Sequence, residues 1–160
     1  MEIISAEIEK KFLLRKLPDG IAKGIKIRQG YLSVGDPEVR VREKGERYFL
    51  TKKGGEGFVR QEEEHEITKE VFEILWLLTE NARIEKTRYE IVAADGLTWE
   101  IDKFQTAYNE GLFTAEVELP DESIVPEIPP AIAEVIEIEV TDDAMYKNKN
   151  LAINKVLVGK

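Results

Sequence analysis

The sequence predicts a mainly β (α+β) fold in which eight main antiparallel strands form a barrel or a sandwich with a few flanking helices. Two observations carry this prediction. Short segments with the two-residue alternation of strands, separated by glycine- and proline-containing turns, fill most of the 160 residues. Helical spacing is confined to a few short stretches, which are too few to cover the faces of a parallel sheet.

Five strands are expected in the first 67 residues, and turn-forming residues separate them. The strands are residues 3–15, 25–33, 39–43, 47–53 and 58–67. Glycine and proline allow the chain to reverse between them. The connections are Pro18-Asp19-Gly20, Gly35-Asp36-Pro37, Lys44-Gly45-Glu46 and Gly54-Gly55-Glu56-Gly57.

Helical spacing replaces strand alternation after Thr68. An amphipathic helix is expected over residues 68–81, with Thr68 as its cap. Its buried face would consist of Val71, Ile74, Leu75 and Leu78. Three further strands are expected at residues 82–93, 98–104 and 113–119.

The carboxy-terminal part of the chain adds two helices and one extended stretch. Pro129-Pro130 predicts the start of a short helix, because proline is favoured at the first helical position. An extended stretch follows at residues 136–140. A closing helix is expected from a cap at Thr141 or Asp142 to about Ile153.

Composition restricts the classes of function. The length fits one domain, residues 1–160, and the net charge of −9 disfavours duplex nucleic acid and anionic membranes as partners. The absence of cysteine excludes disulfides, zinc–thiolate sites and thiol catalysis. No membrane-spanning run or signal peptide is expected, so the predicted location is cytoplasmic. The sequence does not fix the oligomeric state, and a homodimer is compatible with it.

Charged residues recur at strand spacing along most of the chain and would share one face of the sheet. The basic residues of this face are Lys11, Arg40, Arg42, Lys53, Arg60, Lys86 and Arg88. The acidic residues are Glu7, Glu9, Glu62, Glu64, Glu100, Asp102, Glu116 and Glu118. Their formal charges sum to −1, whereas the rest of the chain is strongly acidic. Carboxylates bind Mg²⁺ or Mn²⁺, and arginines form two-point hydrogen bonds with phosphate. This set of residues therefore indicates a site for a metal together with a polyanion.

Two alternatives remain open at this level. A sheet with one solvated face shows the same alternation, and a single charged doublet is most often such a face. Periodicity also does not decide whether the charged face points into the barrel or away from it.

The same residues resemble a known family. Glu7-Ile8-Glu9-Lys10-Lys11 is similar to the ExExK signature of the CYTH superfamily, the triphosphate tunnel metalloenzymes, and the whole chain looks most like its compact bacterial inorganic triphosphatases. The strands that follow are similar to the family's in the same order: Gln29-Gly30-Tyr31-Leu32, Arg40-Val41-Arg42, Thr51-Lys52-Lys53, Arg60-Gln61-Glu62-Glu63-Glu64, Glu85-Lys86-Thr87-Arg88-Tyr89, Glu100-Ile101-Asp102 and Glu116-Val117-Glu118-Leu119.

The resemblance implies an eight-stranded antiparallel barrel, closed around a tunnel that holds a triphosphate with Mg²⁺ or Mn²⁺. Lys11 and Tyr31 would form the catalytic pair, with Lys11 as the base. The metal ligands would be Glu7, Glu9 and Glu118, with Glu116 and Asp102 close by. The phosphates would be held by Arg40, Arg42, Lys53, Arg60, Lys86 and Arg88. Glu62, Glu64 and Glu100 would complete the lining, and alternation favours Lys53 over Lys52 as the inward lysine.

The leading hypothesis is a metal-dependent hydrolysis of tripolyphosphate to pyrophosphate and phosphate. A class IV adenylyl cyclase, a thiamine triphosphatase or a nucleoside triphosphatase on the same scaffold is the alternative. A polyphosphate-binding module without catalysis and a barrel that carries an apolar ligand are the non-enzymatic alternatives.

Overall fold

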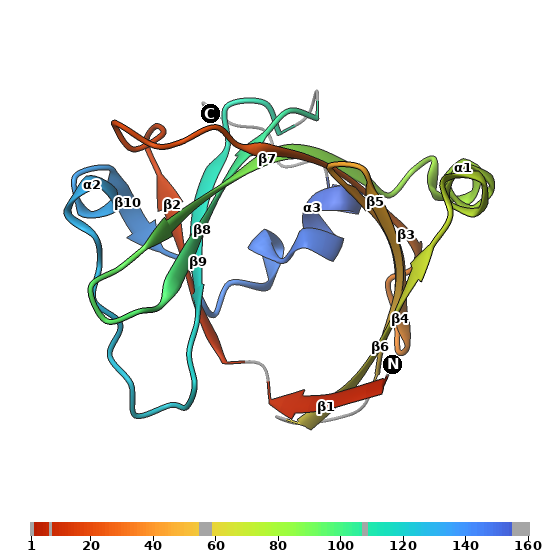
Figure 1. Cartoon of the computed structure of the whole chain (residues 1–160), viewed down its shortest axis with the longest axis horizontal. Helices are drawn as coiled ribbons and strands as arrows, with labels where there is room; N and C mark the ends of the chain where they lie inside the picture. The colour runs from red at the N-terminus through yellow and green to blue at the C-terminus, as the bar shows by residue number, and fades with distance from the viewer. Residues whose placement is uncertain (1, 7, 55–58, 107–108, 155–160) are drawn as a thin grey trace.

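Ten strands form one antiparallel sheet in the computed structural model of the chain (Figure 1). The structure describes residues 2–6, 8–54, 59–106 and 109–154, with the side chains of these ranges except residues 2–6, 59, 60 and 154. The sheet order is β1-β6-β5-β4-β3-β7-β8-β9-β2-β10. The strands are β1 (Glu2–Ala6), β2 (Glu9–Leu14), β3 (Ile25–Ser33), β4 (Glu38–Lys44), β5 (Arg47–Gly54), β6 (Val59–Ile67), β7 (Arg83–Val92), β8 (Thr98–Phe104), β9 (Phe113–Glu118) and β10 (Ile136–Glu139).

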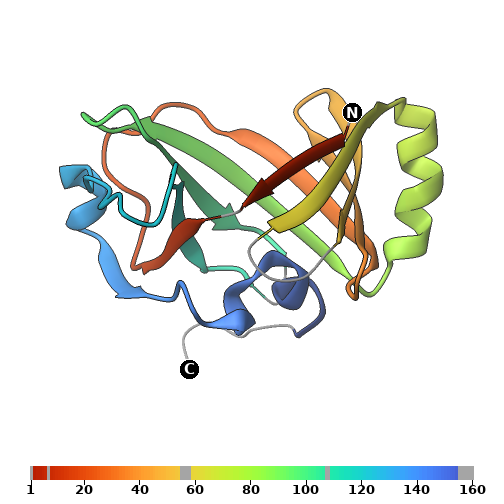
Figure 2. The same cartoon turned by 90° about the horizontal axis from the view of Figure 1, so that it is seen from below.

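The helices are few and short, as expected. They are α1 (Lys69–Trp76), α2 (Pro130–Ala133) and α3 (Asn148–Asn154), with 3-10 turns η1 (Leu77–Thr79) and η2 (Ala144–Tyr146). Figure 1 shows α3 inside the curve of the sheet and α1 outside it. Figure 2 shows α1 and α2 at opposite ends of the molecule. In the described part of the chain no helix has the length and apolar character needed to cross a membrane.

The mainly β antiparallel fold is confirmed, but the strand count differs from the expected eight. The predicted first strand is two strands with different neighbours, since β1 pairs with β6 and β2 pairs with β9 and β10. The extended stretch at residues 136–140 also joins the sheet, as β10. No ladder joins β1 to β10 across the described residues, so the closed barrel stays a prediction.

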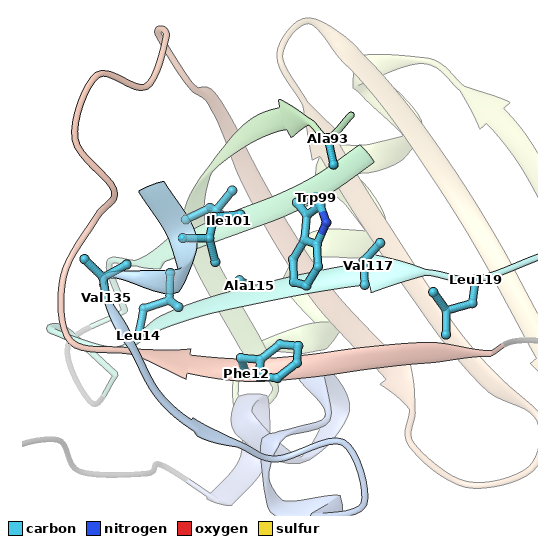
Figure 3. Packing of buried hydrophobic residues seen from close by; sticks show 10 residues of the cluster. Phe12, Leu14, Ala93, Trp99, Ile101, Ala115, Val117, Leu119 and Val135 are labelled. Atoms are coloured by element: carbon cyan, nitrogen blue, oxygen red, sulfur yellow. The ribbon is translucent and has the colours of Figure 1, made fainter. Parts of the chain in front are cut away.

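The apolar side chains of the strands form clusters mainly on the outer face of the sheet. The largest cluster, shown in Figure 3, contains Phe12, Leu14, Ala93, Trp99, Ile101, Ala115, Val117, Leu119, Ile132 and Val135. The Phe12 and Trp99 rings pack at a tilt with their centroids 5.7 Å apart, and Ile132 of α2 belongs to the same cluster. Trp99 and Ile101 of β8 face this cluster. Successive side chains of a strand alternate between its faces, so Glu100 and Asp102 face the interior. The charged face therefore points inward.

The predicted buried face of the first helix is wrong for Val71, Ile74 and Leu78, which are exposed, but Leu75 is half-buried and packs against the sheet side. Thr68 is its cap, as expected, because the Thr68 hydroxyl accepts a hydrogen bond from Val71 N. The side chains of Ile74 and Leu78, however, are 66% and 70% exposed, whereas the aromatic residues Phe72 and Trp76 are buried. Aromatic rings bury more area than branched aliphatic side chains, and this pair meets the sheet. The helix turns accordingly, with Phe72 and Trp76 inward.

Arg28 explains why this face packs on the sheet. Its guanidinium lies 5.2 Å from the centre of the Phe72 ring and 4.8 Å from that of Trp76. The same group donates to Glu43 and Glu73, which joins β3, β4 and α1. A cation over two aromatic faces adds to their burial, which favours the aromatic face over the aliphatic one.

The predicted closing helix is also shorter and interrupted. A 3-10 turn capped by Asp143 is separated from α3 by Lys147, which has an extended backbone. The hydroxyl of Thr141, an expected cap, instead accepts a hydrogen bond from Lys11 N at 3.1 Å. Val140 N donates to the Lys11 carbonyl, so this stretch follows β2 and cannot begin a helix.

Replacing Gly30 by alanine is expected to destabilise the fold by about 1–3 kcal/mol, because the site has no space for a methyl group. A Cβ at Gly30 would lie 2.7 Å from Thr79 Cβ, and the Thr79 hydroxyl is fixed by Trp76 and Arg83. Urea unfolding of Gly30→Ala would measure the loss. Gly35→Ala is the matched control, since its nearest described neighbour atom is 4.0 Å away. Equal stability of the two variants would contradict this account of the packing.

Candidate active site

A cavity of about 790 Å³ opens on the inner face of the sheet and collects most of the predicted site residues. Its lining holds nine acidic and eight basic side chains, so its formal charge is close to zero. The predicted residues that line it are Glu9, Lys11, Tyr31, Arg40, Arg42, Lys53, Glu62, Arg88, Glu100, Glu116 and Glu118.

The other predicted residues lie beside the cavity or outside the described residues. Lys86 and Asp102 are buried in the sheet interior, next to Arg88. Glu64 accepts a hydrogen bond from the Thr51 hydroxyl at 2.9 Å. Glu7 and the side chain of Arg60 lie outside what the structure describes, so their predicted roles are not tested.

One wall of the cavity is acidic because of the strand register. Glu9 on β2 stands directly opposite Glu118 on β9, and Glu100 on β8 stands opposite Glu116 on β9. Like charges directly opposite each other destabilise a sheet unless a cation lies between them. Carboxylate oxygens are the preferred ligands of Mg²⁺ and Mn²⁺, so the chemistry of this wall fits a divalent cation.

The acidic wall is not a preformed metal cage. In the described residues no three acidic or histidine side chains stand close enough together to hold a metal ion. Lys11, opposite Glu116 in the register, also takes part of the negative charge, with Nζ 3.7 Å from Glu116 Oε2. A metal would therefore have to draw in carboxylates, and Glu9 and Glu118 are the facing pair best placed to do this.

The basic side of the cavity is built by β4 and β5. Arg40 and Arg42 alternate on β4, so both side chains face inward. Arg40 Nε is buried and has no hydrogen-bond partner among the described residues. Burial, together with the neighbouring Arg40 and Arg88, lowers the pKa of the Arg42 guanidinium. An unsatisfied buried donor within a group of like charges favours the entry of an anion.

The two adjacent lysines of β5 separate as alternation predicts. Lys53 lines the cavity. Lys52 is exposed, and its Nζ lies 3.9 Å from Glu63. Lys52 therefore serves as an internal control for Lys53.

Lys86, Arg88 and Asp102 form a buried ion cluster beneath the cavity. Arg88 donates two hydrogen bonds to Asp102, at 2.8 and 2.9 Å, and Lys86 Nζ lies 2.8 Å from Asp102 Oδ2. Burial alone would raise the pKa of Asp102, but Lys86 and Arg88 hold it well below its usual range. Burial lowers the pKa of Lys86 to about 7, against the opposing effect of Asp102. Both oxygens of Asp102 are thus engaged by cations, which favours an anchoring role over metal ligation.

Lys11 and Tyr31 line the same cavity but have different hydrogen-bond partners. Lys11 Nζ donates to the main-chain carbonyl of Tyr146. The Tyr31 hydroxyl accepts a hydrogen bond from Gln29 Nε2 at 2.6 Å. The expected catalytic pair is therefore assembled around one space, with the carboxy-terminal segment bound to its lysine.

Several residues that shape the site were not predicted. Gln29 is hydrogen-bonded to both Tyr31 and Arg42. Glu38 Oε1 lies 4.0 Å from Lys149 Nζ. Asn148 Oδ1 accepts a long hydrogen bond from Lys86 Nζ at 3.4 Å. Gln29 could have been found, because it shares the strand parity of Tyr31. Asn148 and Lys149 belong to α3, and nothing in their spacing signals that this helix enters the interior.

Comparisons with known proteins agree with this geometry. Residues 5–150 match the CYTH domain. Over 154 residues the chain is 42% identical to the inorganic triphosphatase of Nitrosomonas europaea, covering 92% of this chain and 97% of that protein. Over 152 residues it is 45% identical to the inorganic triphosphatase of Acetivibrio thermocellus, covering 92% and 94%.

A solved structure gives the same result in three dimensions. The crystal structure of an inorganic triphosphatase matches with a TM-score of 0.69 and 39% identity, over 92% of this chain and 94% of that one. The range that matches the CYTH domain, residues 5–150, extends from β1 into α3 and so includes the cavity-lining residues described above. The chain belongs to the CYTH domain family.

Proposed function

We propose that the chain hydrolyses inorganic triphosphate to pyrophosphate and phosphate in this cavity, with Mg²⁺ or Mn²⁺ as cofactor. The observation that carries the proposal is that one cavity is lined by both a basic and an acidic wall. The basic wall has Arg40, with its buried unsatisfied Nε, and Arg42, and the acidic wall has carboxylates paired across β2, β8 and β9. The relatives named inorganic triphosphatase support the choice of substrate. The strands β1 and β2 are consecutive in the chain but pair with β6 and β9, which lie in distant parts of the sheet. This connection favours a single domain whose sheet closes into a barrel, and the cavity would then be a tunnel.

The basic side binds the phosphate chain. Arg40 and Arg42 present planar guanidinium groups that suit two-point contacts with phosphate oxygens, and Lys53 adds a point charge. Arg88 reaches the lining while bound to Asp102. Arg60 would extend this side, and Lys86 would act from beneath it.

The acidic wall would hold the metal. Glu9 and Glu118 would be ligands with Glu7, and Glu116 would stand close by. When bound, a divalent cation neutralises charge on the phosphate oxygens and lowers the pKa of water. Asp102, which the resemblance also places near the metal, would hold Arg88 and Lys86 in position instead.

Lys11 and Tyr31 act on the attacking water. The water oxygen bonds to the terminal phosphorus, the bridging P–O bond breaks, and pyrophosphate leaves with the electron pair. Lys11 accepts the water proton as the general base. The Tyr31 hydroxyl donates a hydrogen bond to the attacking water or to a phosphate oxygen. The hydrogen bond from Lys11 Nζ to the Tyr146 carbonyl can persist in this step, because a neutral amine keeps two N–H donors while its lone pair takes the proton.

The carboxylates argue against the binding-module alternative. A site that only binds a polyanion gains nothing from Glu9, Glu100, Glu116 and Glu118 on one wall, because they repel it. Phosphate release from tripolyphosphate, ATP and thiamine triphosphate, with cyclic AMP formation followed in the same reactions, separates the catalytic alternatives.

Removal of divalent metal is expected to abolish phosphate release from tripolyphosphate, because the acidic wall would then repel the substrate. The measurement is phosphate release with a chelator and after re-addition of Mg²⁺ or Mn²⁺. Full activity in the chelator would refute the proposed role of the acidic wall. Thermal unfolding with and without metal checks that the fold is retained.

Lys11→Ala and Glu9→Ala are each expected to lower kcat by at least about 100-fold, because they remove the base and a metal ligand. Lys10→Ala is the matched control, since Lys10 lies between them on the opposite face of β2. Steady-state phosphate release checks the prediction, and circular dichroism confirms folding. Wild-type turnover by Lys11→Ala would remove Lys11 from the mechanism.

Lys53→Ala is expected to raise KM for tripolyphosphate by about tenfold, because it removes a charge that contacts the substrate in the ground state. Lys52→Ala should leave KM unchanged, since that side chain pairs with Glu63 on the outside. The two variants carry the same change at neighbouring positions of β5. If both raise KM equally, the inward assignment of Lys53 is wrong.

A further inference from the structure

A buried glutamine connects two residues of the cavity lining. Gln29 on β3 has no exposed surface and does not itself line the cavity. Its Oε1 accepts a hydrogen bond from Arg42 Nε at 2.7 Å, and its Nε2 donates to the Tyr31 hydroxyl at 2.6 Å. The strand register supports the first contact, because Gln29 and Arg42 are directly opposite each other on β3 and β4.

Arg42 fixes which way the amide points. A guanidinium has only donors, so the amide oxygen must face Arg42 and the amide NH₂ must face Tyr31. The Tyr31 oxygen therefore accepts from Gln29, and the hydroxyl proton is left to point elsewhere. The cavity is where this proton can be used, since Tyr31 is among its lining residues.

The environment keeps the proton on Tyr31. Burial raises the pKa of the Tyr31 phenol, although the positive charge of Arg40 opposes the rise. Near neutral pH the hydroxyl is therefore protonated and available as a donor. A donor aimed at a developing negative charge on phosphate, or at the attacking water, stabilises the transition state.

We propose that Gln29 is a positioning residue: it holds the Tyr31 hydroxyl as a hydrogen-bond donor toward the cavity and fixes the Arg42 guanidinium for the substrate. The inference deepens the proposed triphosphate hydrolysis and rests on it. Gln29 acts on the reaction through its two neighbours and does not touch the substrate. Loss of its contact with Tyr31 should lower kcat, and loss of its contact with Arg42 should raise KM.

Two substitutions separate these effects. Gln29→Glu keeps an acceptor for Arg42 but has no donor for Tyr31, so the tyrosine proton turns toward the carboxylate. It should lower kcat for tripolyphosphate about tenfold or more and change KM by less than about threefold. Gln29→Met, which has similar length and no such hydrogen bonds, should lower kcat and also raise KM at least about threefold. Gln105→Glu is the control, because Gln105 is exposed and bonded to Thr87.

A double-mutant cycle tests the route through Tyr31. In a Tyr31→Phe background the kcat loss caused by Gln29→Glu should disappear, because no hydroxyl remains to be turned. The same kcat loss in both backgrounds, or wild-type kcat in Gln29→Glu and Gln29→Met, would overturn the proposal. If Gln29→Glu does not fold, Gln29→Met in the same two backgrounds gives the answer.

The tyrosine hydroxyl can also be followed without activity. The ¹³Cζ resonance of Tyr31, assigned by its loss in Tyr31→Phe, titrates with the phenol. Loss of the Gln29 donor should raise the pKa of Tyr31 in Gln29→Met but not in Gln105→Glu. An unchanged titration in Gln29→Met would overturn the proposal, whatever the effect of this substitution on kcat. If the wild-type chain released no phosphate from tripolyphosphate, the proposed function would fail, and the titration would still decide whether Gln29 orients Tyr31.

Discussion

The interior of this sheet depends on the ion cluster of Lys86, Arg88 and Asp102. None of the three is more than 7% exposed, and one carboxylate bonds to two cations. An isolated charge in such a place costs several kcal/mol, so removal of one partner would leave the others uncompensated. The cluster also extends beyond the sheet, because Lys86 contacts Asn148 of α3. It therefore fixes the register of β7 and β8, seats α3, and holds Arg88 at the edge of the cavity.

A charged interior forces the apolar side chains outward. Alternation leaves Phe12, Trp99 and Ile101 on the opposite face, and a sheet cannot expose such a face to water without cost. Two separate coverings solve this problem: the segment with α2 over one part of the sheet, and α1 with Phe72 and Trp76 over another. The core is thus divided among the outer clusters and a small inner one around α3. Outer packing is what makes the polar cavity possible.

The sequence allowed the main strands and the charged residues that these strands direct into the cavity to be largely predicted, because both follow from the two-residue period. Strand alternation separated Lys53 from Lys52 correctly, and the inward direction of the charged face followed only from the family resemblance. The face of α1 was not predictable in the same way, since Ile74 and Phe72 fit helical spacing equally well and Arg28, distant in sequence, decides between them. The entry of α3 into the interior and the hydrogen bonds of Thr141 depend on tertiary contacts that no local pattern records.

The near balance of charge in the cavity has a consequence for binding. A lining with nine acids and eight bases can be stable without a ligand, because its charges also pair with each other. Lys11 lies opposite Glu116 in the register, and the Arg88 guanidinium reaches Glu100 at 3.1 Å. In the proposed reaction a triphosphate would bring several negative charges to this balance, and one or two divalent cations would bring compensating positive ones. Either alone would unbalance the lining, so each favours binding of the other. The arginine pair and the facing carboxylates are therefore best understood together, as the two sides that would receive the polyanion and the metal.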